Sequence, residues 1–260
     1  MGFVKTPAEL ASYFETPARL FPGAKMLGAT FATRADIVAR LLPPPLTPAE
    51  SPTTMVFIAE YPETNLGPGY REAALFLHCQ YQGEAGTYCL AMPIDSEEAR
   101  CTNGRDIFGF PKKLATIHLE RRDDTVHGWV ERFGVRFFEL TVSLMGTMPE
   151  LPPTGPNFLF KASPRIDLTP GFDGPVFLCK QRTEVVLKSL EVGMPELTFK
   201  DSSRDPWAEV EVVSPIAGFY IVSDNTMRPG EVVTTVDADA YLPYYFKMVD
   251  FPVFADRRVP

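Results

Sequence analysis

Residues 104–120, GRDIFGFPKKLATIHLE, place two adjacent lysines, Lys112 and Lys113, directly after an aromatic–proline corner. The apolar, partly β-branched run that follows predicts a strand over 114–120. Lysine is depleted in strands and is rarely buried without a partner. Two lysines at the entrance to an apolar strand therefore need a chemical explanation as well as a structural one.

Successive side chains of a strand point to opposite faces, so the two lysines should diverge. Lys112 would then share a face with Leu114, and Lys113 would share the other face with Ile117. Phe110 adds an apolar wall, and loss of hydration disfavours the charged form of an amine. Because the two amines point apart, we expect desolvation, more than the neighbour's charge, to favour a neutral amine at Lys112. A neutral amine adds to carbonyls to form Schiff bases. We expect Lys113 to pair with an acid behind the site.

The rest of the chain is rich in strand-like runs and poor in helices. A capping box at Thr6–Glu9 predicts one short helix, the periodicity of 34–42 predicts a second, and 237–248 predicts a closing helix. Apolar runs bounded by turn residues predict strands over 55–61, 71–81, 87–94, 114–120, 125–133, 135–145, 157–164, 176–193, 208–213 and 218–223. Because strands follow one another directly, we predict an α+β, mostly antiparallel fold that forms a single domain over 1–260.

The bulk composition excludes several classes of function. The formal net charge is −8, which argues against a nucleic-acid partner because phosphate binding needs a positive surface. There is no apolar stretch of about 18 residues and no signal-peptide pattern, so we expect a cytoplasmic protein without a membrane partner. The four cysteines lack C-x-x-C spacing and only three histidines occur, which predicts free thiols and no metal site.

The segment GRDIFGFPKKLA resembles the signature of the acetoacetate decarboxylase family, in which Gly-Arg-acid precedes an aromatic residue, Pro, Lys and Lys. Further along the chain, 69–83 (GYREAALFLHCQYQG), 90–99 (LAMPIDSEEA) and 156–164 (PNFLFKASP) resemble other family segments in the same order. The resemblance implies a conical, barrel-like sheet with few peripheral helices and assembly into homo-oligomers. It also implies chemistry that needs no cofactor and no metal.

Position by position, the resemblance implies that Lys112 is the Schiff-base lysine, Lys113 its companion and Glu72 the active-site glutamate. Three residues match apolar wall positions that contact the substrate: Phe110, Met92 and Phe21. Arg105 is expected either to bind a substrate carboxylate or to pair with Asp106.

The chain departs from the family at two polar positions. The family carries an arginine before its first strand, where this chain has Ala24 or Lys25. It also carries a second glutamate where this chain has Val56, with Glu60 out of register on the same strand.

The predicted function is decarboxylation of an acetoacetate-like β-keto acid through an imine on Lys112, with Glu72 moving protons. The two departures motivate an alternative, aldolase–dehydratase chemistry on a 2-oxo acid through the same lysine. A third possibility is a small-molecule binding protein without catalytic activity.

Overall fold

The computed structural model describes residues 2–15, 18–100 and 104–250. Its strands are β1 (Arg19–Ala32), β2 (Thr47–Pro48), β3 (Thr53–Thr64), β4 (Gly67–Tyr81), β5 (Glu84–Ile94), β6 (Lys112–Leu114), β7 (Thr116–Arg122), β8 (Thr125–Arg132), β9 (Val135–Thr147), β10 (Asn157–Lys161), β11 (Val176–Gln181), β12 (Thr183–Phe199), β13 (Ser214–Met227) and β14 (Glu231–Val236). The helices are α1 (Pro7–Glu15), α2 (Ala35–Leu41), α3 (Glu97–Arg100), α4 (Asp106–Phe108) and α5 (Ala238–Tyr245), with 3-10 turns η2 (Trp207–Glu209) and η3 (Phe246–Met248).

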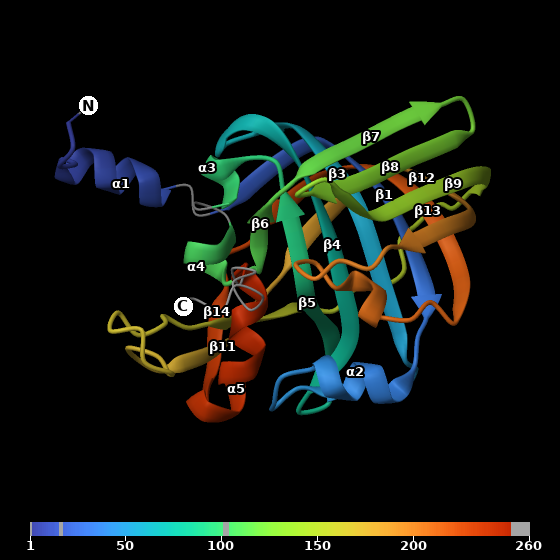
Figure 1. Cartoon of the computed structure of the whole chain (residues 1–260). Coiled ribbons are helices and arrows are strands. Elements are labelled where there is room, and N and C mark those ends of the chain that lie inside the picture. Colours follow the sequence, from blue (N-terminus) through green and yellow to red (C-terminus); the bar gives the residue numbers. More distant parts are fainter. Residues whose placement is uncertain (1, 16–17, 101–103, 251–260) are drawn as a thin grey trace.

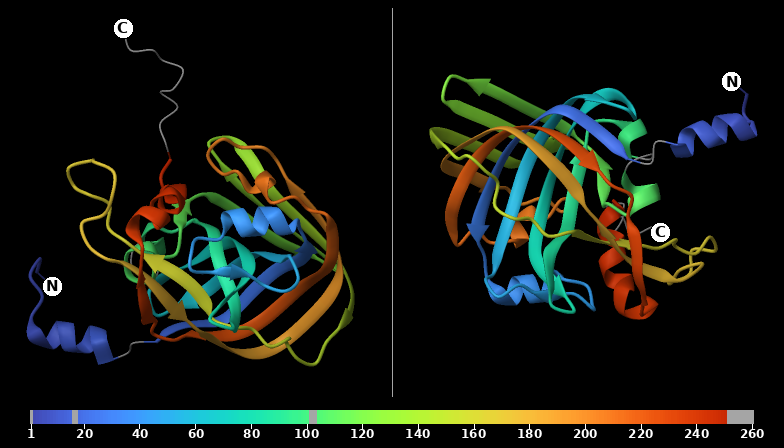
Figure 2. Two further views of the ribbon diagram at one scale, coloured as in Figure 1. Left: turned by 90° about the horizontal axis from the view of Figure 1, so that it is seen from below. Right: turned by 180° about the vertical axis from the view of Figure 1, so that it is seen from behind.

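All of these strands belong to one strongly curled sheet (Figures 1 and 2). Its order is β14-β11-β10-β5-β4-β3-β1-β13-β12-β9-β8-β7, with β2 on β4 and β6 on β5. The pairings of β5 with β6 and with β10 are parallel, and the others are antiparallel. The predicted class, mostly antiparallel with few peripheral helices, is therefore confirmed, although the sheet stays open between β14 and β7 instead of closing into a barrel.

Both faces of the central strands are covered by apolar side chains. On β4, Leu75 and Leu77 belong to the core inside the curl, whereas Ala74 and Phe76 belong to a second core on its outer face. A strand buried on both faces is continuously apolar and does not alternate. This explains why 71–81 lacks a clear polar face, and it places an apolar layer outside the sheet, where the candidate site lies.

Several predicted elements form as expected. The capping box is present, because the backbone amide of Thr6 donates to Glu9 (2.8 Å) and the amide of Glu9 donates to the hydroxyl of Thr6 (3.3 Å). Helix α2 falls within 34–42, and α5 with η3 falls within 237–248. Cys79, Cys89 and Cys179 are free thiols, while Cys101 lies outside the described residues.

Other predicted boundaries were wrong for local physical reasons. Residues 208–213 form no strand, because the segment begins in the 3-10 turn Trp207–Glu209, where the side chain of Trp207 is buried and Val210 N–H donates to Trp207 O. The run 176–193 is divided at Arg182 into β11 and β12, and the run at 114–120 is divided at Ala115 into β6 and β7. Strands β1 and β14 were not predicted. In β1, Gly23 and Gly28 interrupt the apolar pattern.

No helix among the described residues is long and apolar enough to cross a bilayer.

The close approach of β12 to β9 gives a test of the sheet register. A Cβ at Gly193 would lie 1.9 Å from the carbonyl oxygen of Ser143, so Gly193→Ala should force the two strands apart. We expect a loss of about 1–3 kcal/mol in unfolding free energy, measured by denaturant or thermal unfolding. Gly146→Ala on β9 is the matched control, since nothing lies within 4 Å of its Cβ position. Equal stability of the two variants would show that the β9–β12 register is wrong.

Candidate active site

A buried contact between Lys112 and Glu72 forms the centre of the candidate site. The Lys112 Nζ lies 2.7 Å from Oε2 of Glu72, and the two side chains are only 2% and 8% exposed. Strand β5 fixes the positions of both residues by backbone pairing: Met92 of β5 pairs with Lys112, and Ile94 of β5 pairs with Glu72 on β4. Strand β5 therefore lies between β6, which carries Lys112, and β4, which carries Glu72 (Figure 1).

The aromatic–proline corner in the sequence delivers Lys112 to this position. Gly109 ends α4 with a left-handed backbone (φ 85°), which favours glycine. A Cβ at this position would also lie 2.4 Å from the carbonyl oxygen of Phe160, so the chain can pass here only without a side chain. Phe110 and Pro111 then turn the chain into β6, and the amide of Lys112 donates to the carbonyl of Phe110 (2.8 Å).

Aromatic rings enclose the pair. The Lys112 Nζ lies 5.7 Å from the ring centroid of Tyr70 and 5.8 Å from that of Phe110, within the range of cation–π attraction. The Tyr61 hydroxyl donates to Oε1 of Glu72 at 3.0 Å, so each carboxylate oxygen has a partner. Burial raises the pKa of the Tyr61 phenol well above its usual range, and the charge of Glu72 adds to this. Tyr61 therefore remains a proton donor at neutral pH.

The pair opens into a cavity of about 590 Å³ on the outer face of the sheet. Alternate residues of β4, among them Glu72, Phe76 and His78, line it, and the distance from Glu72 to His78 along the strand is about 20 Å at roughly 3.3 Å per residue. Its far end is polar, with Nδ1 of His78 2.6 Å from the Thr53 hydroxyl and the Asn157 amide nearby in the lining. Burial lowers the pKa of His78, which favours the neutral ring.

The structure brings together five of the residues singled out from the sequence. Phe21, Met92 and Phe110 line the cavity beside Lys112 and Glu72.

Lys113 and Arg105 lie elsewhere. Lys113 points to the opposite face of β6, where its Nζ lies 3.1 Å from Asp250 and 3.7 Å from Asp205. Arg105 does not line the cavity of Lys112, because its guanidinium lies 3.6 Å from Asp106 and borders a separate cavity. The expected pairing with Asp106 is the geometry observed.

At the two positions that depart from the family, no charged side chain lines this cavity. Lys25 pairs with Glu60 at 3.0 Å, Glu60 also accepts from Arg71 at 2.8 Å, and none of the three lines the cavity. Ala24 and Val56 are buried among apolar residues. Among the described lining residues, Lys112 and His78 are the only basic side chains.

Tyr61 is the functional residue that the sequence analysis missed. It stands opposite Tyr70 in the β3–β4 hairpin, next to the pairing of Ala59 with Glu72. The register of the β3–β4 hairpin follows from the turn near Asn65 and the apolar runs on either side of it, all of which can be recognised in the sequence. Counting back from the turn would have placed Tyr61 and Glu72 on one face of the sheet.

Comparison with known proteins identifies the family of the chain. The family model described as acetoacetate decarboxylase matches residues 1–236. The acetoacetate decarboxylase of Burkholderia multivorans is 29% identical over 222 residues, which cover 82% of this chain and 87% of that protein.

Two solved structures share the fold. An acetoacetate decarboxylase-like enzyme from Sphingomonas wittichii superimposes with a TM-score of 0.76 at 19% identity, over 90% of this chain and 99% of that chain. The enduracididine biosynthesis enzyme MppR, solved with the condensation product of pyruvate and imidazole 4-carboxaldehyde, gives a TM-score of 0.73 at 17% identity, over 84% and 89% of the two chains. By its sequence match over residues 1–236, this chain belongs to the acetoacetate decarboxylase family.

Proposed function

We propose that the protein is a carbon–carbon lyase that decarboxylates a β-keto acid through an imine on Lys112. The observation that supports this most strongly is the buried amine of Lys112, held at 2.7 Å from the carboxylate of Glu72. An amine nucleophile needs an adjacent group that can take its proton, and this contact provides one. Membership of a family whose curated relatives are decarboxylases supports the same chemistry.

The reaction can be written with the groups in contact. A proton passes from Lys112 to Glu72, and the neutral amine adds to the ketone carbon. The acid form of Glu72 returns the proton to the carbinolamine oxygen, and water leaves to give a protonated imine. Proton transfers of this kind contribute about 10²–10⁴-fold to a rate.

The protonated imine then accepts the electron pair of the breaking bond. The carboxylate β to the imine carbon leaves as CO2, and the electron pair forms an enamine. The enamine carbon takes one proton that comes from solvent and is relayed by the Glu72 carboxylate, which Tyr61 contacts, and water hydrolyses the resulting protonated imine to release a ketone and protonated Lys112. Phe21, Met92 and Phe110 surround this position with apolar surface, which favours the loss of a charged carboxylate as neutral CO2.

Borohydride trapping tests the nucleophile. With acetoacetate and borohydride, we expect a stable mass increase on Lys112, because reduction converts the imine into a secondary amine. Lys112→Gln should abolish the adduct, whereas Lys113→Gln should retain it, since Lys113 faces away from the cavity. Peptide mapping that places the adduct on another lysine would contradict the assignment.

Aldolase–dehydratase chemistry on a 2-oxo acid is the second candidate. It is favoured by the length of the cavity, whose polar far end at His78 and Asn157 leaves room for a second carbonyl compound. It is also favoured by the lack of an arginine among the described lining residues. The imine of Lys112 would lose a proton to form an enamine, which would attack an aldehyde.

Two assays on the same preparation separate the candidates. The first follows CO2 released from acetoacetate, and the second follows consumption of pyruvate together with an aldehyde. We expect turnover in the first. Condensation without CO2 release would establish the second candidate. Turnover in neither assay, together with the absence of a trapped adduct, would favour a small-molecule binding protein without catalytic activity.

Gly104 gives a test that leaves the reacting groups unchanged. A Cβ at this position would lie 2.3 Å from Cδ of Lys112, so Gly104→Ala should displace the buried lysine from Glu72. We expect kcat to fall at least about tenfold, which is about 1.4 kcal/mol in the barrier, while the far-UV circular dichroism is retained. Gly174→Ala is the control, because nothing lies within 4 Å of its Cβ position. Full activity of Gly104→Ala would show that the position of Lys112 does not limit the reaction.

A further inference from the structure

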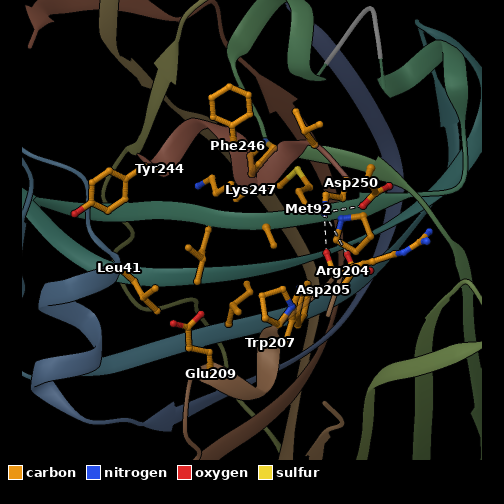
Figure 3. Close-up of a pocket in the computed structure, with 18 of the residues that line it drawn as sticks. Leu41, Met92, Arg204, Asp205, Trp207, Glu209, Tyr244, Phe246, Lys247 and Asp250 are labelled. Carbon is orange, nitrogen blue, oxygen red and sulfur yellow. Dashed lines mark hydrogen bonds and ion pairs between the residues drawn. The ribbon is translucent and has the colours of Figure 1, made fainter. Parts of the chain in front are cut away.

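A second cavity, of about 370 Å³, lies on the inner face of the sheet behind the candidate active site (Figure 3). Its wall is apolar and comes from Leu41, Leu75, Leu90, Trp207, Tyr244 and Phe246. Met92 lines both cavities, and the two lysines of β6 divide between them: Lys112 faces the outer one and Lys113 the inner one. The inner cavity is therefore separated from the active site by the thickness of β5 and β6.

Lys247, on η3, enters this cavity, and Figure 3 shows its side chain extending towards Tyr244. Its Nζ donates to the Tyr88 hydroxyl and lies 3.3 Å from the carbonyl oxygen of Cys89. Lys247 as a whole is half-buried, and its amine contacts Tyr88 and Cys89, which are 2% and 1% exposed. Burial lowers the pKa of the Lys247 ammonium to about 7.

The acids that border the cavity are already paired. Asp205 and Asp250 contact both Arg132 and Lys113. Glu209 pairs with Arg40. Over the part of the chain that the structure describes, no carboxylate forms an ion pair with Lys247. A buried cation without a counter-ion is unfavourable, and an anion delivered to it would remove that cost.

We infer that the inner cavity is a second small-molecule site that binds an apolar carboxylate, with its carboxyl group on Lys247 and its hydrocarbon part against Trp207, Leu41 and Leu75. Lys113 and Arg204 also line the cavity, but Lys113 is ion-paired with Asp205 and Asp250. The Arg204 guanidinium lies over the ring of Phe133, so the head group is assigned to the Lys247 amine, which contacts the Tyr88 hydroxyl. The volume lies at the small end of the range for ligand sites, which fits a medium-chain fatty acid or a substituted aromatic acid. Nothing in the proposed reaction uses Lys247, so this site is separate from the imine chemistry.

Binding of a carboxylate at this site should be coupled to proton uptake by Lys247, and this coupling can be measured. In the free protein Lys247 is largely charged below about pH 7 and largely neutral above it. A bound carboxylate favours the charged amine, so binding at about pH 8 should take up close to one proton per site, whereas binding at about pH 6 should take up little. The affinity should then fall by up to tenfold for each pH unit above the free-state pKa of about 7, until the higher pKa of the bound state is reached.

The two titratable residues that contact the Lys247 amine, Tyr88 and Cys89, both have raised pKa values and stay protonated across this window. Burial raises the pKa of Tyr88 well above its usual range, and it also raises the pKa of the Cys89 thiol. At the rim, Asp205, Asp250 and Lys113 are held in ion pairs.

Calorimetric titration of the full-length protein with octanoate tests the inference. Titrations at about pH 6 and pH 8, in buffers of different ionisation enthalpy, report both affinity and proton uptake. We expect saturable 1:1 binding with proton uptake at the higher pH. Lys247→Met should weaken binding at least tenfold and abolish the proton uptake, whereas Lys112→Met should change neither. 1-Octanol, which lacks the charge, should bind without dependence on pH or on Lys247.

Several results would overturn the site. One is octanoate binding that Lys247→Met leaves unchanged, and another is binding that Lys112→Met removes, which would place the ligand in the outer cavity. Absence of octanoate binding by the wild-type protein would also overturn the site. Thermal unfolding of each variant without ligand shows whether it is folded. Should Lys247→Met fail to fold, Lys247→Arg replaces it: retained binding without the proton uptake supports the site, and unchanged proton uptake contradicts it.

Discussion

The candidate active site depends on one contact, the buried pair of Lys112 and Glu72. Two charges removed from water are expensive, and replacing such a pair by apolar residues is often neutral or stabilising. A pair of this kind therefore has little reason to exist for stability alone. The features around it serve to hold it in place: the glycine corner at Gly109, the parallel pairing of β6 with β5, and the Tyr61 hydroxyl on the second oxygen of Glu72.

Because the sheet is covered on both faces, the adjacent residues Lys112 and Lys113 lie in two different buried environments. Because β6 alternates, Lys112 faces the aromatic cavity outside the sheet and Lys113 faces the acids inside it. Lys113 then neutralises Asp250 and Asp205 together with Arg132, and this anchors the chain behind Lys112. Two adjacent lysines in an apolar strand are therefore explained by different partners on opposite faces.

Much of this could be predicted from the sequence, and the remainder could not for identifiable reasons. The PKK corner, Glu72 and the three apolar wall positions lie in local motifs, so their neighbours in sequence identify them. Tyr61 was missed because its contact depends on hairpin register. Arg105 was ambiguous because Asp106 competes for it in the adjacent position. Lys247 is far from every motif in sequence, and its entry into the inner cavity follows only from the docking of η3 against β5.

The most direct measurement is a crystal structure of the protein after reduction with borohydride in the presence of a keto acid. The account predicts continuous electron density from Nζ of Lys112 into the outer cavity, with the new carbon within contact distance of Phe110 and Met92, and Glu72 still within hydrogen-bonding distance of the nitrogen. An unmodified Lys112, or an adduct on Lys247 or Lys25 with the outer cavity empty, would contradict it.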